Sequence, residues 1–578
     1  MHNTLSILNE CFKILSSTEY LERVSVSVLP KCRQEKYLEV WRLTTEIDIS
    51  DCAEDIIFYV AFLESFPYEI PDIYYLDTKY DYLPHIGYED RKLCLYDNGI
   101  CYDIEQPELV IRACIKQAKN IIKSSATGII PDDFINEIES HWEHHFDKEP
   151  NVDDQWIILN APPADSHEME WATYQDVFLG AGRSTKKHTI VYAPENTTNS
   201  AITEFLSECE IIKRGKALYL PHISIPKRPP YLINFATLLN MVDPTDIKLI
   251  KTVVNKNTGI YIIFPLQAPI IYGGVYVPSI QTKQKGFREQ TPFYIYTKLA
   301  NKKKPLQRIQ GRIYSNTRIA ERTAGRLESK YSFYIAGLGS VGSNLVNLLR
   351  GFNNCSFTFA DKESLSIDNI GRHLLGFSYI DQSKAYALKH FLKSTRPDLQ
   401  VEVNCKDFHE ILSQELNIIN EHSCLFVLTG DQMIDMRLLA YIKDGKITTP
   451  VFMIWIEPFA IAGHMVYINP KQNLNVWLYD ENLNYKYNLI ASSEYNDEKK
   501  VKTFLKKTAG CNSQYAEYSG NDINLLLAAF YPHIVQLIQK QDTSKCIRWI
   551  GNTELAKEKE ITLTESRGSK GDIQVYEL

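Results

Sequence analysis

The stretch YSFYIAGLGSVGSNLVNLL, residues Tyr331–Leu349, decides the fold of the C-terminal half of the chain. YSFYIA predicts a strand, GLGSVG a tight turn, and the residues after it a helix. The apolar residues of that helix share one face: Leu345, Leu348, Leu349 and Phe352. A GxGxxG sequence between a strand and a helix favours a bound phosphate, because free N–H groups and the helix dipole attract anions there.

The pattern continues on the C-terminal side of this turn. The strand CSFTFAD ends at Asp361, a helix begins near Asp381, and the strand CLFVLTGD ends at Asp431. Repeated strand–helix alternation predicts a Rossmann-like, doubly wound parallel sheet over residues 316–578. The apolar run Val451–Ile468 is interrupted by polar residues and a proline, so it predicts two buried strands joined at a turn.

Length and composition set broader limits. A chain of 578 residues is long enough for several domains, and 44% apolar with 23% charged residues is ordinary for a soluble protein. A net charge of -8 does not favour nucleic acid as the main ligand. We find no membrane-spanning run and no signal peptide, so we expect a cytoplasmic protein. The 12 cysteines form no CxxC pair, which disfavours a structural zinc site.

Two further domains are predicted before the Rossmann-like one. Residues 1–148 read as an amphipathic helix, a meander of strands, the proline-rich FPYEIPD, a loop and further helices, which is an α+β unit. Residues 149–315 are rich in strand signals and predict a mixed α/β linker domain without a catalytic pattern. The fold class is therefore multidomain, α+β followed by α/β.

The glycines of the turn and an acidic residue after it predict the nucleotide site. Gly337, Gly339 and Gly342 let the backbone approach a phosphate. Asp361, at the end of the second strand, can accept hydrogen bonds from both ribose hydroxyls. These four residues suit an NAD-dependent dehydrogenase and an ATP-using enzyme equally well.

The next polar residues favour ATP. Asn369, Arg372 and Lys384 follow Asp361, and two cations near the phosphate end suit a triphosphate whose pyrophosphate must be stabilised as it leaves. Asp431 ends a parallel strand at the edge where ligands bind, so it is the candidate ligand for Mg²⁺. Singly, the two cations read as surface charges and Asp431 as a helix cap.

GLGSVGS, FADKESLSIDNIGRH, QSKA and LTGD together resemble the ThiF/MoeB and ubiquitin-activating superfamily over about residues 316–540. The resemblance implies that ATP and Mg²⁺ are used to adenylate the C-terminal carboxylate of a small protein. It also implies a homodimer or pseudo-dimer, in which an arginine upstream of the first strand reaches the ATP of the partner. Four arginines qualify: Arg312, Arg318, Arg322 and Arg326.

Cys511, in KKTAGCNSQYAEYS, is the candidate nucleophile of the C-terminal region. An acyl-adenylate is a mixed anhydride, so a nearby thiolate can take the acyl group as a thioester. The lysine-rich segment before Cys511 would lower the pKa of its thiol. By its sequence alone Cys511 reads as an inert surface cysteine. The resemblance favours the nucleophile, because activating enzymes carry such a cysteine on a loop beyond the nucleotide site.

Cys94 is the candidate nucleophile of the N-terminal domain. FPYEIPD, then PHIG, then LCLYD resembles the ubiquitin-conjugating fold over about residues 1–145. That family has His-Pro-Asn before its cysteine, whereas this chain has His85-Ile86-Gly87, which leaves the oxyanion donor unassigned and His85 open to a purely structural role. Cys101 is the second choice, and core packing is the alternative for a lone cysteine.

A conjugating-like domain fused to an activating-like domain resembles the CD-NTase-associated conjugating–activating enzymes of bacterial CBASS antiphage operons. That resemblance implies adenylation of the C-terminus of a cGAS-like CD-NTase, capture on Cys511, transfer to Cys94 and attack by an amine of an unknown target. Two other hypotheses remain: a sulfur-carrier adenylyltransferase whose N-terminal domain only binds, and a non-catalytic interaction protein.

Overall fold

The computed structural model describes most of the chain. The described residues are 2–49, 52–79, 83–87, 90–96, 100–127, 134, 137–143, 156–160, 164–175, 187–193, 197–226, 231–255, 257–267, 271–280, 282, 289–298, 304–323, 325, 329–472, 477–507, 514–564 and 568–578. They form two compact units, one of Met1–Glu195 with Cys209–Tyr314 and one of Asn196–Glu208 with Ser315–Leu578. The predicted domain boundaries at 148/149 and 315/316 stay a prediction.

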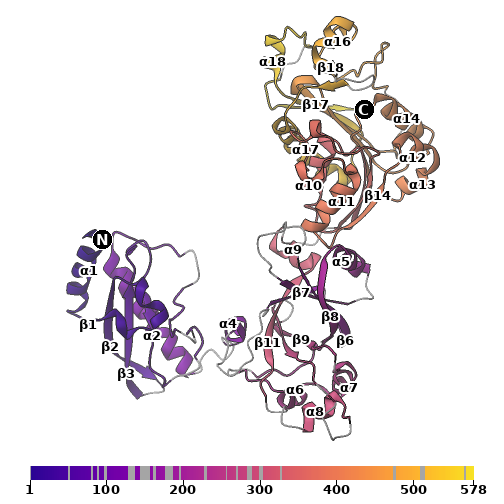
Figure 1. Cartoon of the computed structure of the whole chain (residues 1–578). Helices are drawn as coiled ribbons and strands as arrows, with labels where there is room; N and C mark the ends of the chain where they lie inside the picture. The colour runs from indigo at the N-terminus through magenta and orange to yellow at the C-terminus, as the bar shows by residue number, and fades with distance from the viewer. Residues whose placement is uncertain are drawn as a thin grey trace. The chain divides into compact units, whose positions relative to one another are not determined.

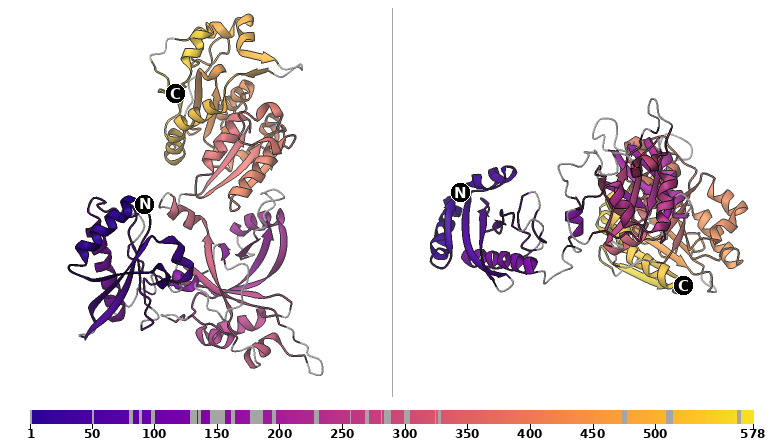
Figure 2. Two further views of the ribbon diagram at one scale, coloured as in Figure 1. Left: turned by 60° about the vertical axis from the view of Figure 1, so that its left-hand side comes forward. Right: turned by 90° about the horizontal axis from the view of Figure 1, so that it is seen from below.

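The N-terminal part is a four-stranded antiparallel sheet with two helices on one face (Figures 1 and 2). Its elements are α1 (His2–Leu15), β1 (Tyr20–Val24), β2 (Glu39–Ile49), β3 (Cys52–Phe62), β4 (Asp72–Tyr74) and α2 (Pro107–Thr127). Alternate residues of β2 and β3 share one apolar cluster with Leu8 and Leu15 of α1 and Ile111 of α2, and these three side chains are fully buried. The expected α+β unit is confirmed.

The middle part is a closed seven-stranded barrel in the order β10-β11-β5-β7-β6-β8-β9. Its strands are β5 (Trp156–Asn160), β6 (His167–Gln175), β7 (Lys187–Tyr192), β8 (Glu210–Tyr219), β9 (Ile260–Gln267), β10 (Ile271–Val277) and β11 (Gln307–Tyr314). Its helices are α4 (Ile138–Glu143), α6 (Phe235–Met241), α7 (Pro244–Val253) and α8 (Pro292–Lys298). Closure gives every strand two neighbours, which removes exposed sheet edges.

Helix α5 (Thr197–Ser207) belongs to the C-terminal unit, although its sequence lies within the predicted linker domain. Glu204 of α5 pairs with Lys389 at 2.6 Å and with the fully buried Lys393 at 2.8 Å. A buried ammonium group needs an anion beside it, and Glu204 supplies that anion.

The C-terminal part is an eight-stranded sheet in the order β14-β13-β12-β15-β16-β17-β20-β21. Its strands are β12 (Tyr331–Ala336), β13 (Cys355–Ala360), β14 (Gln400–Asn404), β15 (Cys424–Val427), β16 (Val451–Ile456), β17 (Ala462–Ile468), β20 (Lys545–Ile550) and β21 (Ile573–Glu577). The first five are parallel, as predicted, whereas β17, β20 and β21 run antiparallel. The two strands predicted within Val451–Ile468 are β16 and β17, and the short turn between them makes this pair antiparallel.

Helices cover both faces of this sheet (Figure 1). One layer packs on Phe333 and Ile335, and the other packs on Tyr334 and Ala336. The first layer is α10 (Ser340–Leu349), α11 (Lys384–Thr395) and α17 (Gly520–Lys540), and the second is α12 (Phe408–Gln414), α13 (Leu416–Asn420) and α14 (Gln432–Lys443). Successive residues of β12 thus face opposite layers, which makes the strand apolar throughout.

The remaining short elements lie around these layers. They are α9 (Asn316–Arg322), α15 (Ser492–Tyr495), α16 (Glu498–Phe504), α18 (Thr553–Glu558), β18 (Leu505–Lys507) and β19 (Gln514–Ala516). Within the described part of the chain, no helix combines the length and apolar content of a membrane span.

Candidate functional site: a glycine turn and a cysteine pocket

The turn after β12 is tight at two of its glycines and open at the third. Gly337 has φ +88°, and a Cβ on it would lie 2.7 Å from the backbone of Leu428. A Cβ on Gly342 would lie 2.0 Å from the carbonyl oxygen of Gly337. At Gly339 a Cβ would meet nothing within 4 Å. Helix α10 begins here with no side-chain cap, so its first N–H groups are available to an anion.

Five of the eight predicted nucleotide-site residues line one cavity of about 300 Å³: Gly337, Gly339, Asp361, Lys384 and Asp431. Gly342 lies behind it, packed on the turn. Asn369 and Arg372 line a second, larger cavity of about 990 Å³, and Glu363 lines both. The structure therefore gathers the predicted residues around two adjoining hollows.

Asp361 fixes the turn from one side. Its carboxylate accepts hydrogen bonds from the N–H of Leu338 at 2.7 Å and of Glu363 at 2.8 Å. Burial raises the pKa of Asp361, whereas these hydrogen bonds and the charge of Lys384 act the other way. Lys384 is almost fully buried, and its Nζ lies 2.5 Å from Glu363. Each carboxylate oxygen has a second lone pair, so Asp361 can still accept from a ribose.

His373 fixes the turn from the other side, and sequence reasoning assigned it no role. Its Nδ1 accepts from the N–H of Leu375 at 3.0 Å, so Nε2 donates to the carbonyl oxygen of Leu338 at 2.8 Å. Burial lowers the pKa of His373 to about 4, which keeps the ring neutral. His373 lies inside the quoted FADKESLSIDNIGRH, but only the folded chain shows what it contacts.

Asp431 is the N-cap of α14 and lines the nucleotide cavity as well. Its carboxylate accepts from the N–H of Met433 at 2.9 Å, and His409 lies 3.6 Å from it. Among the described residues, no group of three or more His, Cys, Asp or Glu side chains is arranged to hold a metal ion. One carboxylate with phosphate oxygens and waters suits Mg²⁺, which is commonly bound with few protein ligands.

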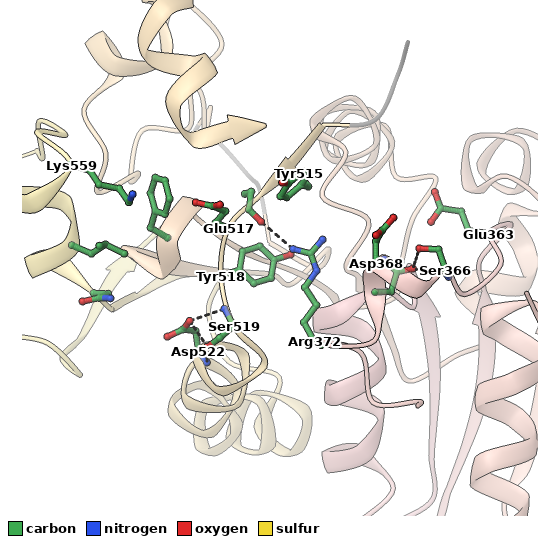
Figure 3. A pocket seen from close by; sticks show the side chains of 16 residues that line it. Glu363, Ser366, Asp368, Arg372, Tyr515, Glu517, Tyr518, Ser519, Asp522 and Lys559 are labelled. Carbon is green, nitrogen blue, oxygen red and sulfur yellow. Dashed lines mark hydrogen bonds between the residues drawn. The ribbon is translucent and has the colours of Figure 1, made fainter. Parts of the chain in front are cut away.

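Arg372 lines the larger cavity, on the side of strand β19 (Figure 3). Its Nη1 donates to the carbonyl oxygen of Ala516 in β19 at 3.0 Å, and its guanidinium lies 4.8 Å from the ring centroid of Tyr518. Acidic side chains line the same cavity: Glu363, Asp368, Glu517 and Asp522. Asn369 instead accepts from Ser366 and caps a short turn.

Cys511 lies outside the described residues. The strands on either side of it in sequence, β18 and β19, pair with each other, with Lys507 opposite Gln514. Two described lysines near it in sequence are already in ion pairs, Lys506 with Glu517 and Lys500 with Glu494. Among the upstream arginines, Arg312 lies in β11 and Arg318 and Arg322 in α9, whereas Arg326 is not described.

Cys94 is exposed beside a tight turn of the N-terminal part. Its N–H donates to the carbonyl oxygen of His85 at 2.8 Å, and Ile86 and Leu93 form a bridge between them. Two cavities, of about 640 and 420 Å³, are both lined by Cys94, His85 and Glu137. Cys101 is also exposed but lines neither of these two cavities.

The segments that hold the glycine turn and the cysteine pocket each match a known protein family. Residues 314–556 match the ThiF family, and residues 31–149 match prokaryotic E2 family B. The chain thus joins an E2-family domain to a ThiF-family domain. The predicted fusion of a conjugating-like with an activating-like domain is therefore confirmed.

Individual relatives are similar to this chain only at low sequence identity or over part of its length. The ATP-dependent ubiquitin transferase-like protein Cap2 of Pseudomonas aeruginosa (strain BWHPSA011 / Pa011) is 28% identical over 127 residues, which is 21% of this chain and 22% of that protein. Among solved structures, PaaA is 12% identical over 43% of this chain and 72% of its own, with a TM-score of 0.30. MccB of E. coli crystallised with ATP is 12% identical over 42% of this chain and 64% of its own, with a TM-score of 0.28.

Proposed function

We propose that this protein is an ATP-dependent enzyme that activates the C-terminus of a protein and conjugates it to an amine through two thioesters, on Cys511 and then on Cys94. One observation carries the proposal. A ThiF-family glycine turn and an E2-family cysteine pocket occur in one chain. An anhydride, a thioester and an amide lie in descending order of acyl reactivity, so each transfer runs downhill.

The nucleotide cavity fits ATP with Mg²⁺. The open side of Gly339 and the uncapped start of α10 leave room and N–H donors for phosphates. Asp361 accepts from the ribose, Lys384 and Arg372 stabilise the charge of the departing pyrophosphate, and Asp431 holds the metal ion. ATP supplies the group that turns an unreactive carboxylate into an anhydride.

The larger cavity is where we place the C-terminal segment of the protein substrate. It adjoins the nucleotide cavity through Glu363 and reaches β19, three residues after Cys511 in sequence. Arg372 donates a hydrogen bond to this strand, so the segment that holds Asn369 and Arg372 is in direct contact with β19. From Cys511 the acyl group passes to Cys94 by exchange between thiols.

At Cys94 the tetrahedral intermediate needs a donor for its oxyanion, since the asparagine of His-Pro-Asn is missing. Gln117 and Asn120 of α2 line the same cavity as Cys94, and their side-chain amides can donate. A lysine of the target, or another amine, then displaces the cysteine. The resemblance to CBASS enzymes makes a CD-NTase the proposed acyl partner, in a cytoplasmic homodimer acting in antiviral defence.

Non-reducing gels test the relay. The protein is incubated with ATP, Mg²⁺ and the candidate CD-NTase, and thiol-sensitive adducts are compared for the wild type, Cys511→Ala, Cys94→Ala and Cys101→Ala. We expect Cys511→Ala to abolish both adducts, Cys94→Ala to retain the adduct on Cys511, and Cys101→Ala to match the wild type. An adduct on Cys94 in the Cys511→Ala variant would show that the proposed order is wrong. ATP–pyrophosphate exchange without any thioester would favour a sulfur-carrier adenylyltransferase instead.

A further inference from the structure

Glu137 holds His85 at two points beside Cys94. Its Oε2 accepts from the main-chain N–H of His85 at 2.6 Å, and its Oε1 accepts a hydrogen bond from Nδ1 of the same imidazole. Two contacts to one carboxylate fix both the backbone and the ring of His85. The ring orientation is therefore set by a residue 52 positions away in sequence.

The backbone of His85 is itself unusual and is joined to the cysteine. His85 has φ +62°, in the left-handed region that few residues other than glycine adopt. Its carbonyl oxygen accepts from the N–H of Cys94 at 2.8 Å. A strained conformation of this kind persists only when the surrounding contacts determine it, and such conformations gather at functional sites. Here those contacts are Cys94 on one side and Glu137 on the other.

Glu137 does not belong to the sheet or helices of the N-terminal part. It directly precedes α4, which is anchored in the barrel. The indole Nε1 of Trp142 donates to the carbonyl oxygen of Ile309 at 2.8 Å, and its ring lies 5.6 Å from that of Phe264. One turn before it, Glu139 accepts from Gln310 at 2.7 Å. The segment that orients His85 is thus fastened to the barrel, although it lies within the residues that match the E2 family.

The charge of Glu137 suits this role. Partial burial raises its pKa, but contacts with His141 and His85 outweigh burial and lower the pKa of Glu137 to about 2. The carboxylate is therefore ionised at any working pH. A carboxylate on Nδ1 holds the imidazole in the tautomer that carries its proton on Nδ1, which leaves Nε2 as the ring nitrogen able to accept a proton.

We propose that Glu137 is a positioning residue for acyl transfer from Cys94, and that it acts through His85. The amine nitrogen attacks the thioester carbonyl, the new C–N bond forms, and the C–S bond breaks. Nε2 of His85 accepts the proton that the amine loses and donates it to the departing Cys94 thiolate. The inference rests on the proposed function, because it assumes that Cys94 carries an acyl group.

A double-mutant experiment separates positioning from a purely structural contact. Every variant carries Cys511→Ala, and Cys94 is charged with a synthetic glycine-terminated peptide supplied as its alkyl thioester. Peptide mapping by mass spectrometry confirms Cys94 as the charged residue. Free lysine is then added, and loss of the acyl group is followed by intact mass. Glu137→Gln is isosteric, and thermal unfolding verifies that each variant folds.

Glu139→Gln is the matched control. It removes the same charge from the same segment and cavity, and it keeps an oxygen that can accept from Gln310.

We expect His85→Ala to slow discharge to lysine about 100-fold and Glu137→Gln about 10-fold. In the His85→Ala background, Glu137→Gln adds less than about twofold, because residues that act as a unit are not additive. Glu139→Gln stays within about twofold of the parent.

Two results overturn the inference while the proposed function stands: wild-type discharge by Glu137→Gln, or an equal loss from Glu137→Gln with and without His85. If Cys94 of the parent neither keeps the peptide nor passes it to lysine, the proposed function fails and this inference fails with it.

Discussion

The glycine turn and the cysteine pocket are built in opposite ways. The turn at Gly337–Gly342 is held by neighbours from its own domain: Asp361, His373 and the backbone after β15. The cysteine pocket takes one of its walls, Glu137, from the C-terminal end of the segment that matches the E2 family, and the helix that follows Glu137 packs on the barrel. The contacts that hold the turn are thus local to one sheet, whereas the cysteine pocket depends on a later segment of the chain that also contacts the barrel.

This difference bears on how the chain works. The contacts that hold the glycine turn come from the C-terminal unit alone. The cysteine pocket keeps Glu137 as one of its walls only while α4, which follows Glu137, stays in place. In the proposed relay, the barrel, for which the sequence predicts no catalytic pattern, is thereby connected to the last step.

Trp142→Ala should have the largest effect and tests that dependence directly. The side chain is 2% exposed, so its loss leaves a cavity and should cost about 4 kcal/mol in the free energy of unfolding, measured by denaturant titration. Discharge of Cys94 should slow as well, while ATP–pyrophosphate exchange stays unchanged.

The matched control is Trp477→Ala, which removes a tryptophan that is 48% exposed, at a cost below about 1 kcal/mol. Normal discharge by a destabilised Trp142→Ala variant would show that Glu137 is held without this anchor.

Gly342→Ala and Gly339→Ala should separate stability from binding within the turn. The methyl group at Gly342 would meet a carbonyl oxygen, so we expect a loss of about 3 kcal/mol in stability and about 100-fold in pyrophosphate exchange. The methyl group at Gly339 would stand in open space beside the cavity, and that residue has an ordinary φ of −69°.

Gly339→Ala should therefore unfold like the wild type and bind ATP about 10-fold more weakly. Equal thermal stability of the two variants would contradict the crowding at Gly342.

The same contrast explains what the sequence predicted. The strand, turn and helix around GLGSVG are contiguous, so periodicity and glycine spacing locate them and Asp361 together. The antiparallel edge depends on where β20 returns after more than seventy residues, which no local pattern encodes. His373 and Glu137 were missed for a related reason, because each acts through a partner that only folding brings near.

Acidification should destabilise the glycine turn first and the cysteine pocket at lower pH. The folded pKa of His373 is about 4 against an ordinary 6.5, so the unfolded chain takes up the proton first. The stability that the neutral ring contributes is full above about pH 6.5 and is lost toward pH 4, by up to about 3 kcal/mol. For Glu137 the folded pKa is about 2 against 4.5, so its contribution is lost only between those values.

Hydrogen exchange of the N–H groups of Leu375 and His85 follows the two regions separately. Leu375 should lose protection between about pH 6.5 and pH 4, and His85 between about pH 4.5 and pH 2. In His373→Gln, an amide that cannot be protonated replaces the ring, so the loss at Leu375 should disappear. Simultaneous loss in both regions of the wild type would contradict the assignment.

Arg372→Lys should have the smallest effect and tests whether the nucleotide site is as self-contained as the glycine turn suggests. The backbone carbonyl of Arg372 accepts from Asn344 of α10 at 3.1 Å, while its guanidinium contacts Ala516 and the ring of Tyr518. Lysine keeps the charge but loses the planar stacking, which is worth about 0.5–1 kcal/mol, or about twofold to fivefold in rate.

The step that slows identifies the role of Arg372. If it acts on phosphate, pyrophosphate exchange falls; if it acts on the hairpin, exchange is normal and only thioester formation on Cys511 falls. Tyr518→Phe is the control, because it keeps the ring and removes only the hydroxyl contact with Ser340 at 3.1 Å. We expect both steps to slow together, because the backbone of Arg372 contacts the helix of the turn and its side chain contacts the strand after Cys511. Loss confined to thioester formation would show that the C-terminal site, too, depends on a distant segment for its last step.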